Sequence, residues 1–357
     1  MRLDRDRMPV RFTVATSVMS GLIVAAVLKA FQAGVSKGAT LLWFAVAAVG
    51  AAAISWAVVI TIRRAWKRTP RVFLTTSAFS QKYYVAAFVQ RMHGALDQEG
   101  IDMVLKVPDR DYDASAQSHH LRRILERRHD YLGGIVFAGE MQRLRGDLAT
   151  FCERLRLPVV FTDLEPFEKE TEYPDNSAYI GYDTGELGEI AGRWLVKHLR
   201  GRKRPRVLIV ASREHPQRQQ RCEQVLRSAL PDVVIALDDG CGFVRARARD
   251  AVRAHVRQLG PRQCLDAIFC TNDEMALGAV DALSAPTPAT QATVVVGVDG
   301  VAEAKALIDT PGSPLRATVV QDAHRLAVSI ADLLVKMHNG HPVPKRTILD
   351  AEIYEAG

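Results

Sequence analysis

The stretch IFCTNDEMALGAVDAL, residues 268–283, joins two patterns that together indicate the fold. An apolar, strand-like run stops at Thr271, and an apolar pattern with helical spacing begins at Met275. Between them stand an amide and two carboxylates, Asn-Asp-Glu at 272–274. Asn is a favoured helix N-cap, and acidic side chains suit the first turn of a helix. The stretch therefore predicts a buried strand leading into a helix. Its polar junction either only caps the helix or also binds a polar molecule.

The same alternation of apolar runs and amphipathic segments continues on both sides of this stretch. Continuous β-branched runs are typical of strands buried on both faces, as in parallel sheets. Strands that alternate with helices predict βαβ units. The number of runs exceeds one ordinary sheet, so we expect two parallel-sheet lobes, with strands at 72–76, 103–107, 134–138, 158–162, 206–210, 232–237, 266–270, 293–298 and 317–320.

Charge is distributed unevenly along the 357 residues. Residues 1–71 carry a net charge of +9, whereas the remaining chain carries −2. A basic footprint for nucleic acid is therefore not expected in the globular part. The five cysteines show no paired spacing, and no metal-ligand or nucleotide motif occurs, so we expect no disulfide framework, metal or cofactor.

Two apolar segments in the first 71 residues predict a membrane anchor. Residues 12–28 and 39–62 contain no charged side chain. A bilayer core needs about 20 apolar residues in a helix. We expect transmembrane helices at about 10–31 and 39–62. Alternatively, the first segment is a cleaved signal peptide, although no clean small-x-small site follows it.

The charges that flank these segments predict their orientation. Four arginines precede the first segment, two lysines separate the segments, and five basic residues follow the second. The positive-inside rule then favours both termini in the cytoplasm of an inner membrane. This orientation conflicts with the periplasmic location that the resemblance described next implies.

The stretch TNDEMALGAVDAL (271–283), with VVVGVDG (294–300) and ATVVQD (317–322), resembles the type I periplasmic binding protein family. Ribose-binding proteins and the sugar-binding domains of lactose-type repressors share this pattern. The resemblance covers about 72–350. It implies two doubly wound lobes joined by three hinge crossings, which close on a ligand. We expect the first lobe at 72–182 and 321–346, and the second at 183–320 with the C-terminal tail, within a domain at 72–357.

The resemblance also implies a set of ligand-binding residues at the ends of the strands. Amides and carboxylates suit sugar hydroxyls, and aromatic faces stack on sugar rings. Five positions have a competing structural interpretation: Asn272 as a cap alone, Asp299 as a turn residue before Gly300, and Tyr83, Tyr84 and Phe243 as core. The predicted ligand-binding residues are Gln81, Tyr83, Tyr84, Asp163, Gln219, Phe243, Asn272, Asp299 and Gln321.

Two positions depart from the ribose-binding pattern. An arginine that follows the Asp163 position in that branch is replaced by Leu164, and another near 219 is replaced by Gln219, with Arg218 and Arg221 nearby. An ordinary pentose or hexose is therefore not assumed, and the ligand is expected to be a sugar or polyol-like small molecule.

Several classes of function remain to be compared. No nucleophile elbow or P-loop occurs, so we expect no enzyme. The hydrophobic segments occupy the place where a repressor would carry its helix-turn-helix. The first hypothesis is a membrane-anchored, hinge-closing solute receptor. The alternative is a signalling or scaffold protein whose degenerate domain acts on a protein. Expected partners are the ligand, the lipid bilayer, and a membrane transporter or signalling component.

Overall fold

The computed structural model describes residues 50, 55–58, 69–76, 83–110, 113–137, 141–260, 262–285 and 287–356, with only the backbone at 141–144. The chain divides into two compact units, Met1–Pro70 and Arg71–Gly357. Apart from residues 50 and 55–58, the two predicted membrane helices lie outside the described residues. Within the described part of the chain, no helix combines the length and apolarity needed to cross a bilayer.

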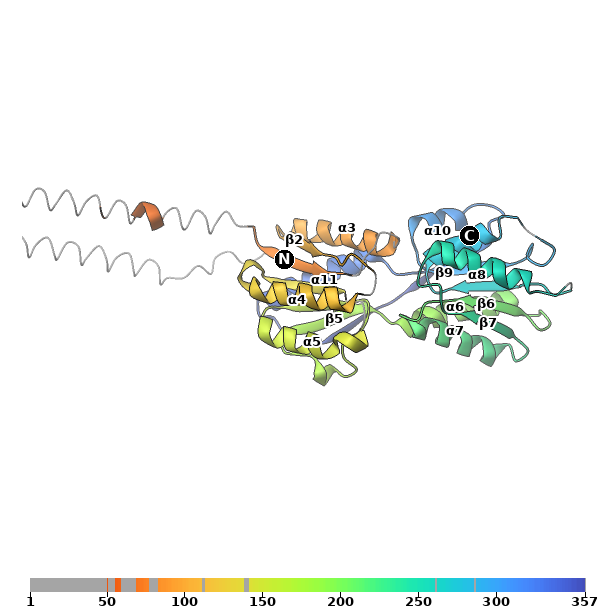
Figure 1. Cartoon of the computed structure of the whole chain (residues 1–357), viewed down its shortest axis with the longest axis horizontal. Helices are drawn as coiled ribbons and strands as arrows, with labels where there is room; N and C mark the ends of the chain where they lie inside the picture. Colours follow the sequence, from red (N-terminus) through yellow and green to blue (C-terminus); the bar gives the residue numbers. More distant parts are fainter. Residues whose placement is uncertain are drawn as a thin grey trace, which may run out of the picture. The chain divides into compact units, whose positions relative to one another are not determined.

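The first lobe of the second unit is built on a six-stranded, wholly parallel sheet. Its strand order is β11-β5-β4-β3-β1-β2. The strands are β1 (Arg71–Thr75), β2 (Asp102–Lys106), β3 (Gly133–Phe137), β4 (Val159–Thr162), β5 (Ser177–Tyr182) and β11 (Arg346–Leu349). The helices are α3 (Tyr83–Gln98), α4 (Ala114–Glu126), α5 (Met141–Leu155) and α11 (Ala323–His338). Helix α3 packs against α11, and α4 packs against α5. Each pair provides cover for the sheet (Figure 1).

The second lobe repeats this arrangement with the strand order β12-β10-β9-β8-β6-β7. Its strands are β6 (Arg206–Val210), β7 (Val234–Asp238), β8 (Ala267–Cys270), β9 (Val294–Asp299), β10 (Leu315–Val320) and β12 (Glu352–Glu355). The helices are α6 (Thr184–Leu199), α7 (Pro216–Ala229), α8 (Arg245–Arg257), α9 (Asp273–Ala282) and α10 (Ala302–Ile308). Helix α6 packs on α7, and α8 packs on α9.

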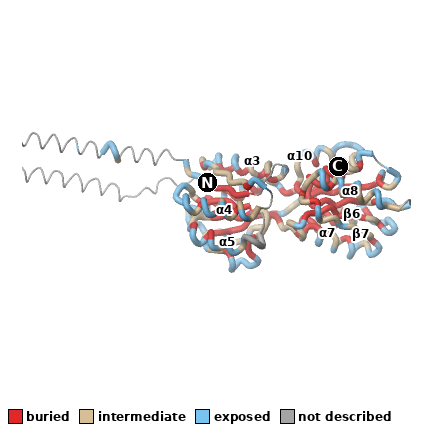
Figure 2. Tube along the Cα trace, in the orientation of Figure 1, coloured by how far each residue is buried: buried red, intermediate tan, exposed pale blue. Residues whose placement is uncertain are grey.

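The central strands of both lobes are buried, as the apolar runs predict. The sequences GGIVF, VVFT, AIFC and VVVGVD of β3, β4, β8 and β9 have no exposed or half-buried residue. Figure 2 shows these buried strands inside a layer of half-buried and exposed helices. Two-sided burial confirms the predicted α/β fold with two parallel-sheet lobes.

Three strands were not predicted from the sequence. Strand β5 has the sequence SAYIGY, in which serine and glycine interrupt the apolar run. Strands β11 and β12 have four residues each, RTIL and EIYE, and lie at sheet edges. Strand β12 pairs antiparallel with β10, so the second sheet is not wholly parallel as expected. Short edge strands carry charged residues and lack the continuous apolar signal of central strands.

The chain passes between the lobes three times: from β5 to α6, from β10 to α11, and from β11 to β12. The hydroxyl of Tyr182, at the first passage, donates a 3.3 Å hydrogen bond to the carbonyl of Asp322, at the second. Asp183 and Asp322 then cap α6 and α11, since each carboxylate accepts two backbone N–H bonds. The first two passages therefore lie side by side, as a hinge requires.

Candidate functional site

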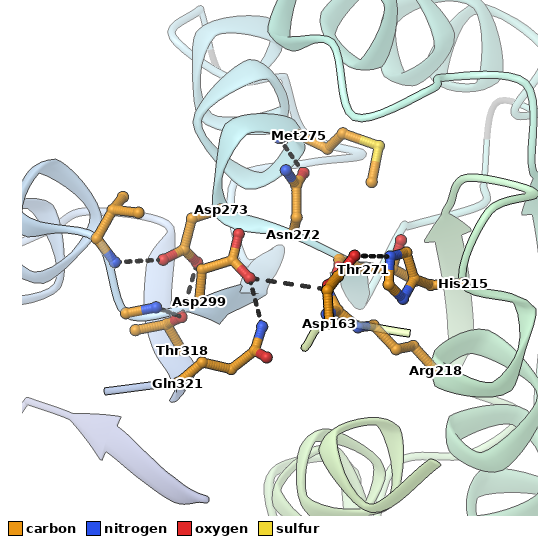
Figure 3. A network of polar contacts seen from close by, with 12 residues as sticks. Asp163, His215, Arg218, Thr271, Asn272, Asp273, Met275, Asp299, Thr318 and Gln321 are labelled. Atoms are coloured by element: carbon orange, nitrogen blue, oxygen red, sulfur yellow. Dashed lines mark hydrogen bonds and ion pairs between the residues drawn. The ribbon is translucent and has the colours of Figure 1, made fainter. Parts of the chain in front are cut away.

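The junction between β8 and α9 holds the polar residues that the sequence singled out. Asn272 Oδ1 accepts a 3.0 Å hydrogen bond from the backbone N–H of Met275, so it caps α9. Asp273 is fully buried, and its carboxylate accepts bonds from the Val301 backbone N–H at 2.9 Å and the Thr318 hydroxyl at 2.7 Å. Gly297 permits this approach, because a Cβ at that position would overlap Asp273 Oδ1. Asp273 therefore fastens α9 to the neighbouring strands (Figure 3).

Asp299, at the end of β9, lies beside the side chains of two other elements. Gln321 Nε2 donates a 2.8 Å hydrogen bond to Asp299 Oδ1, and Arg218 Nη1 lies 3.7 Å from the same oxygen. Burial raises the pKa of Asp299 to about 7, although Arg218 and the Gln321 hydrogen bond oppose the shift. The three side chains converge in Figure 3.

Arg218 is the buried cation of this cluster. It is 4% exposed, and its Nη1 donates a 2.8 Å bond to the Thr271 carbonyl. The next residue on α7, Gln219, is also buried, but no hydrogen bond reaches its Oε1 from any described residue. Arg221 instead bonds Glu189 and Gln224 at the surface. Of the two arginines near the predicted position, the structure places Arg218 in the cluster.

Asp163 brings the first lobe into contact with the second. It follows β4, and its Oδ2 lies 3.6 Å from Nε2 of His215, which precedes α7. The His215 ring packs edge-on against Phe243, with 5.5 Å between ring centroids. Phe243 is 6% exposed and forms part of the core of the second lobe as well.

The two predicted tyrosines differ in their surroundings. Burial raises the pKa of Tyr84 well above its usual value, and the charges of Asp299 and Asp163 add to that rise. Tyr84 therefore lies within electrostatic reach of carboxylates from both lobes. Tyr83 has 56% of its surface exposed, and its backbone opposes the rise that burial causes in the pKa of Glu274 in the second lobe. Gln81 lies outside the described residues.

Three of the predicted site residues have a backbone conformation that L-residues rarely adopt. The φ angles of Asp163, Phe243 and Asp299 are 72°, 59° and 121°. Only Arg156 and Arg204 among the other described non-glycine residues have positive φ. Such conformations cost about 1–3 kcal/mol and cluster at binding and active sites. The strain at the ends of β4 and β9 therefore points to the same place as the polar network.

Buried polar atoms without a hydrogen-bond partner gather at the carboxyl ends of the strands. Buried polar groups are ordinarily paired, so each exception requires an explanation. The first lobe contributes hydroxyls at the ends of β1 and β4, and the second contributes hydroxyl, carboxyl, imidazole, guanidinium and amide atoms. At these strand ends, the unpartnered atoms of the described residues are Thr75, Thr76 and Thr162 Oγ1, Ser212 Oγ, Glu214 Oε2, His215 Nδ1, Arg218 Nε, Gln219 Oε1, Thr271 Oγ1 and Glu274 Oε1.

A groove of about 820 Å³ adjoins this cluster on the side of Asp163. Residues from both lobes line it, including Asp163 and Leu164 from the first, and Glu214 and Pro216 from the second. Ligands in open parallel sheets bind outside the carboxyl ends of the strands, where strand order reverses. In both lobes the order reverses at the first strand, β1 or β6.

The sequence interpretation did not assign ligand-binding roles to His215, Arg218 or Glu274. His215 and Arg218 belong to the segment ASREHPQRQQR that follows β6, and Glu274 stands beside the predicted Asn272. All three residues lie in segments that directly follow a predicted strand, and this position could have identified them as candidates for ligand binding. The choice between Arg218 and Gln219 depends on which face of α7 is turned inward, which the segment alone does not reveal.

Comparison with known protein families identifies one that matches most of this chain. The model of a family described as periplasmic binding protein domain matches residues 72–342. A candidate rhizopine-binding protein of Rhizobium meliloti is 22% identical over 263 residues, covering 71% of this chain and 80% of that protein.

Solved structures share the fold at low sequence identity. The binding component of the arabinose ABC transporter of Shewanella sp. ANA-3, bound to L-arabinofuranose, has a TM-score of 0.69 and 20% identity, and the match covers 80% of this chain and 91% of that one. An ABC transporter binding protein of Actinobacillus succinogenes with bound D-allose has a TM-score of 0.70 and 18% identity, with 80% and 97% covered. One of Bacillus halodurans with bound myo-inositol has a TM-score of 0.69 and 17% identity, with 80% and 94% covered.

Proposed function

This chain belongs to the periplasmic binding protein family, and from that premise we propose that it is a membrane-anchored receptor that closes two lobes around a small sugar or polyol. The family is one of solute-binding proteins, so the chain is not an enzyme, as the sequence predicted. The observation that carries the proposal is the set of unpartnered buried polar atoms that both lobes present at the carboxyl ends of their strands.

The chemistry of these atoms suits a ligand rich in hydroxyl groups. A hydroxyl donates one hydrogen bond and accepts others, so it can pair with hydroxyl, amide and carboxylate groups alike. In the first lobe, the threonine hydroxyls at the ends of β1 and β4 would bond to the ligand. In the second lobe, Arg218 and Asp299 would do so. The three relatives of known structure hold L-arabinofuranose, D-allose and myo-inositol, which supports a ligand of this class.

Lobe closure is the proposed mechanism. We place the lobe boundaries near 183 and 321, where Asp183 and Asp322 cap the helices that follow each passage. The contact between Asp163 and His215 joins the lobes in this structure. A ligand that bonds to both lobes favours the closed state by its differential affinity for that state.

A panel of L-arabinose, D-allose and myo-inositol tests the binding function. A ligand at 100 times its Kd should stabilise the folded protein by about 2.7 kcal/mol. We expect at least one of the three to raise the Tm of the full-length protein. Asp299→Ala should abolish that rise, and the Tm of its free form is measured beside it, because the substitution also removes the carboxylate that lies near buried Arg218. A full response by Asp299→Ala would contradict the site assignment.

The proposed anchor consists of the two apolar segments at about 10–31 and 39–62. Their flanking charges favour a cytoplasmic binding domain, whereas family membership favours a periplasmic one. Alkaline phosphatase fused after residue 357 is active only outside the inner membrane. Its activity would therefore assign the domain to the periplasm, and its inactivity beside a fluorescent fusion would assign it to the cytoplasm. The alternative, a scaffold protein, lacks support from the cluster, since protein docking would not need buried unpartnered atoms.

A further inference from the structure

A second pocket lies in the second lobe, away from the polar cluster and its groove. Its volume is about 340 Å³, at the lower end of the range of small-molecule sites. It lies at the amino ends of the strands, because Arg316 is the second residue of β10 and Glu355 pairs with Ala317 across antiparallel β12. The residues that line it are Trp194, Lys197, His198, Arg316, Glu355 and Ala356.

The aromatic wall of this pocket is fixed to the sheet. The rings of Trp194 and His198, one turn apart on α6, are stacked with 5.1 Å between centroids and 6° between planes. The indole N–H of Trp194 donates a hydrogen bond to the Glu355 carboxylate of β12. The next residue back, Tyr354, donates from its hydroxyl to Asp309 at 2.8 Å. Helix α6 and β12 are therefore joined side chain to side chain at the pocket.

Arg316 stands at an irregularity of β10. The register of β10 against β9 shifts between Leu315 and Ala317, so Arg316 is an extra residue in the pairing. Leu315 and Ala317 are both buried, whereas Arg316 is exposed. Such bulges redirect a side chain and are common beside functional sites. The bulge lets both apolar neighbours enter the core while Arg316 lines the pocket.

The pocket has an excess of positive charge. Lys197 and Arg316 are exposed and form no ion pair with any described residue. Among the described residues that line the pocket, Glu355 is the one acid, and Trp194 already bonds to it. The segment RGRKRPR at 200–206 follows directly after α6. Within that segment Arg202 bonds Asp266 at 2.6 Å, which leaves further exposed cations beside the pocket.

We propose that this pocket binds a phosphate group, carried by a lipid headgroup or by a free phosphate ester, through Lys197 and Arg316. A guanidinium group can bond two phosphate oxygens at once, and a lysine ammonium group adds a point charge. The two cations come from different elements, α6 and β10, so they can approach one anion from two sides. This site does not depend on the proposed binding of a sugar or polyol between the lobes.

The state of His198 agrees with this role. Burial lowers the pKa of His198, and the charges of Arg202 and Arg316 lower it further. The neutral imidazole still has one N–H to donate to an anion. A bound phosphate would raise this pKa again, because an opposite charge favours the charged form.

Calorimetric titration of the full-length protein with inorganic phosphate tests the site. The protein is kept in a polyoxyethylene detergent at neutral pH, and sodium chloride of equal ionic strength is the control titrant. We expect Lys197→Gln and Arg316→Gln each to weaken phosphate binding by about tenfold or more, because each removes a charge-assisted hydrogen bond. Arg253→Gln is the matched control and should bind as the wild type does, because Arg253 is an exposed arginine of α8 that does not line the pocket.

A matched pair of esters distinguishes the two sources of phosphate. Glycerol 3-phosphate and dihexanoyl phosphatidic acid carry the same phosphate monoester, but only the second has acyl chains. Phosphatidic acid that binds about tenfold more tightly assigns the site to a lipid headgroup, and equal binding assigns it to a free ester. The inference is wrong if inorganic phosphate and both esters fail to bind, or if binding survives unchanged in Lys197→Gln and Arg316→Gln.

Discussion

The two lobes share one strand order but contribute differently to the site between them. In the second lobe, Asp273 accepts hydrogen bonds from Val301 and Thr318, and Asp299 accepts one from Gln321 at the lobe boundary. In the first lobe, Thr75, Thr76 and Thr162 present buried hydroxyls that have no partner among the described residues. Both lobes therefore present unpartnered polar groups at their strand ends, and the second lobe adds carboxylates that hydrogen bonds already hold in place.

This difference follows from where each lobe places its polar groups. Asp273 is fixed by an N–H and a hydroxyl of its own lobe, so its position does not depend on the first lobe. Asp163 lies beside His215 of the other lobe. The second lobe is thus expected to bind first, and the first lobe to complete the site on closure.

The largest effect on stability is expected where α6 packs against α7 in the second lobe. A Cβ on Gly188 of α6 would lie 1.9 Å from the Arg218 carbonyl oxygen, so Gly188→Ala must push α7 away. We expect a loss of about 3 kcal/mol in the free energy of unfolding, measured with urea. Gly94→Ala on α3 of the first lobe is the matched control, because nothing lies within 4 Å of its added Cβ. That variant should gain about 0.5–1 kcal/mol. Equal losses in both variants would contradict the packing described.

A pair of threonine substitutions tests the contrast between the lobes directly. Thr318→Val removes the hydroxyl that donates to buried Asp273 and should cost about 1–3 kcal/mol. Thr162→Val removes a buried hydroxyl that has no described partner, so the free protein should be unchanged or slightly more stable. The ligand response of Thr162→Val should nevertheless weaken. If both variants lose equal stability, the first lobe is as fully bonded as the second.

The smallest predicted effect is a pH dependence that arises at Glu274. Its folded-state pKa of about 7 lies above its usual value, so the folded protein holds a proton that the unfolded chain releases. The stability of the wild type should therefore fall as pH rises from about 5 to 8. Relative to Glu274→Gln, the fall should be about 1 kcal/mol, because partial hydration weakens the penalty. A wild type that gains stability over this range relative to Glu274→Gln would contradict the prediction.

The sequence was informative wherever a signal is local. Asn272 was expected to cap a helix, and it does, because an N-cap depends on residues only three positions apart. The central strands were expected from their apolar runs, since burial on both faces requires apolar side chains throughout. Strand β5 was not predicted, because its sequence SAYIGY mixes serine and glycine with apolar residues. It is buried because it lies between two neighbouring strands of the sheet.

The sequence predicted only part of the site, because the site is formed by residues that are far apart along the chain. Arg218 reaches Thr271, 53 positions along the chain, and Asp163 reaches His215, 52 positions along. Asp163 and Asp299 were expected from the resemblance, and the structure places each beside a residue that was not expected, His215 and Arg218 respectively. Their roles in ligand binding stay a prediction, as do those of Tyr83, Tyr84, Gln219, Phe243 and Gln321.

By itself, the sequence determined the class of fold, the apolar segments at the N-terminus and the polar ends of the strands, because each depends on neighbouring residues. Only the tertiary structure decided that Arg218 rather than Gln219 accompanies Asp299, that Asp273 holds α9 in place within the second lobe, and that both lobes present unpartnered polar atoms at their strand ends. These features depend on the turn of α7 and on the packing of two lobes. A hydrogen bond requires atoms about 3 Å apart, and only the folded chain brings residues so far apart in sequence to that distance.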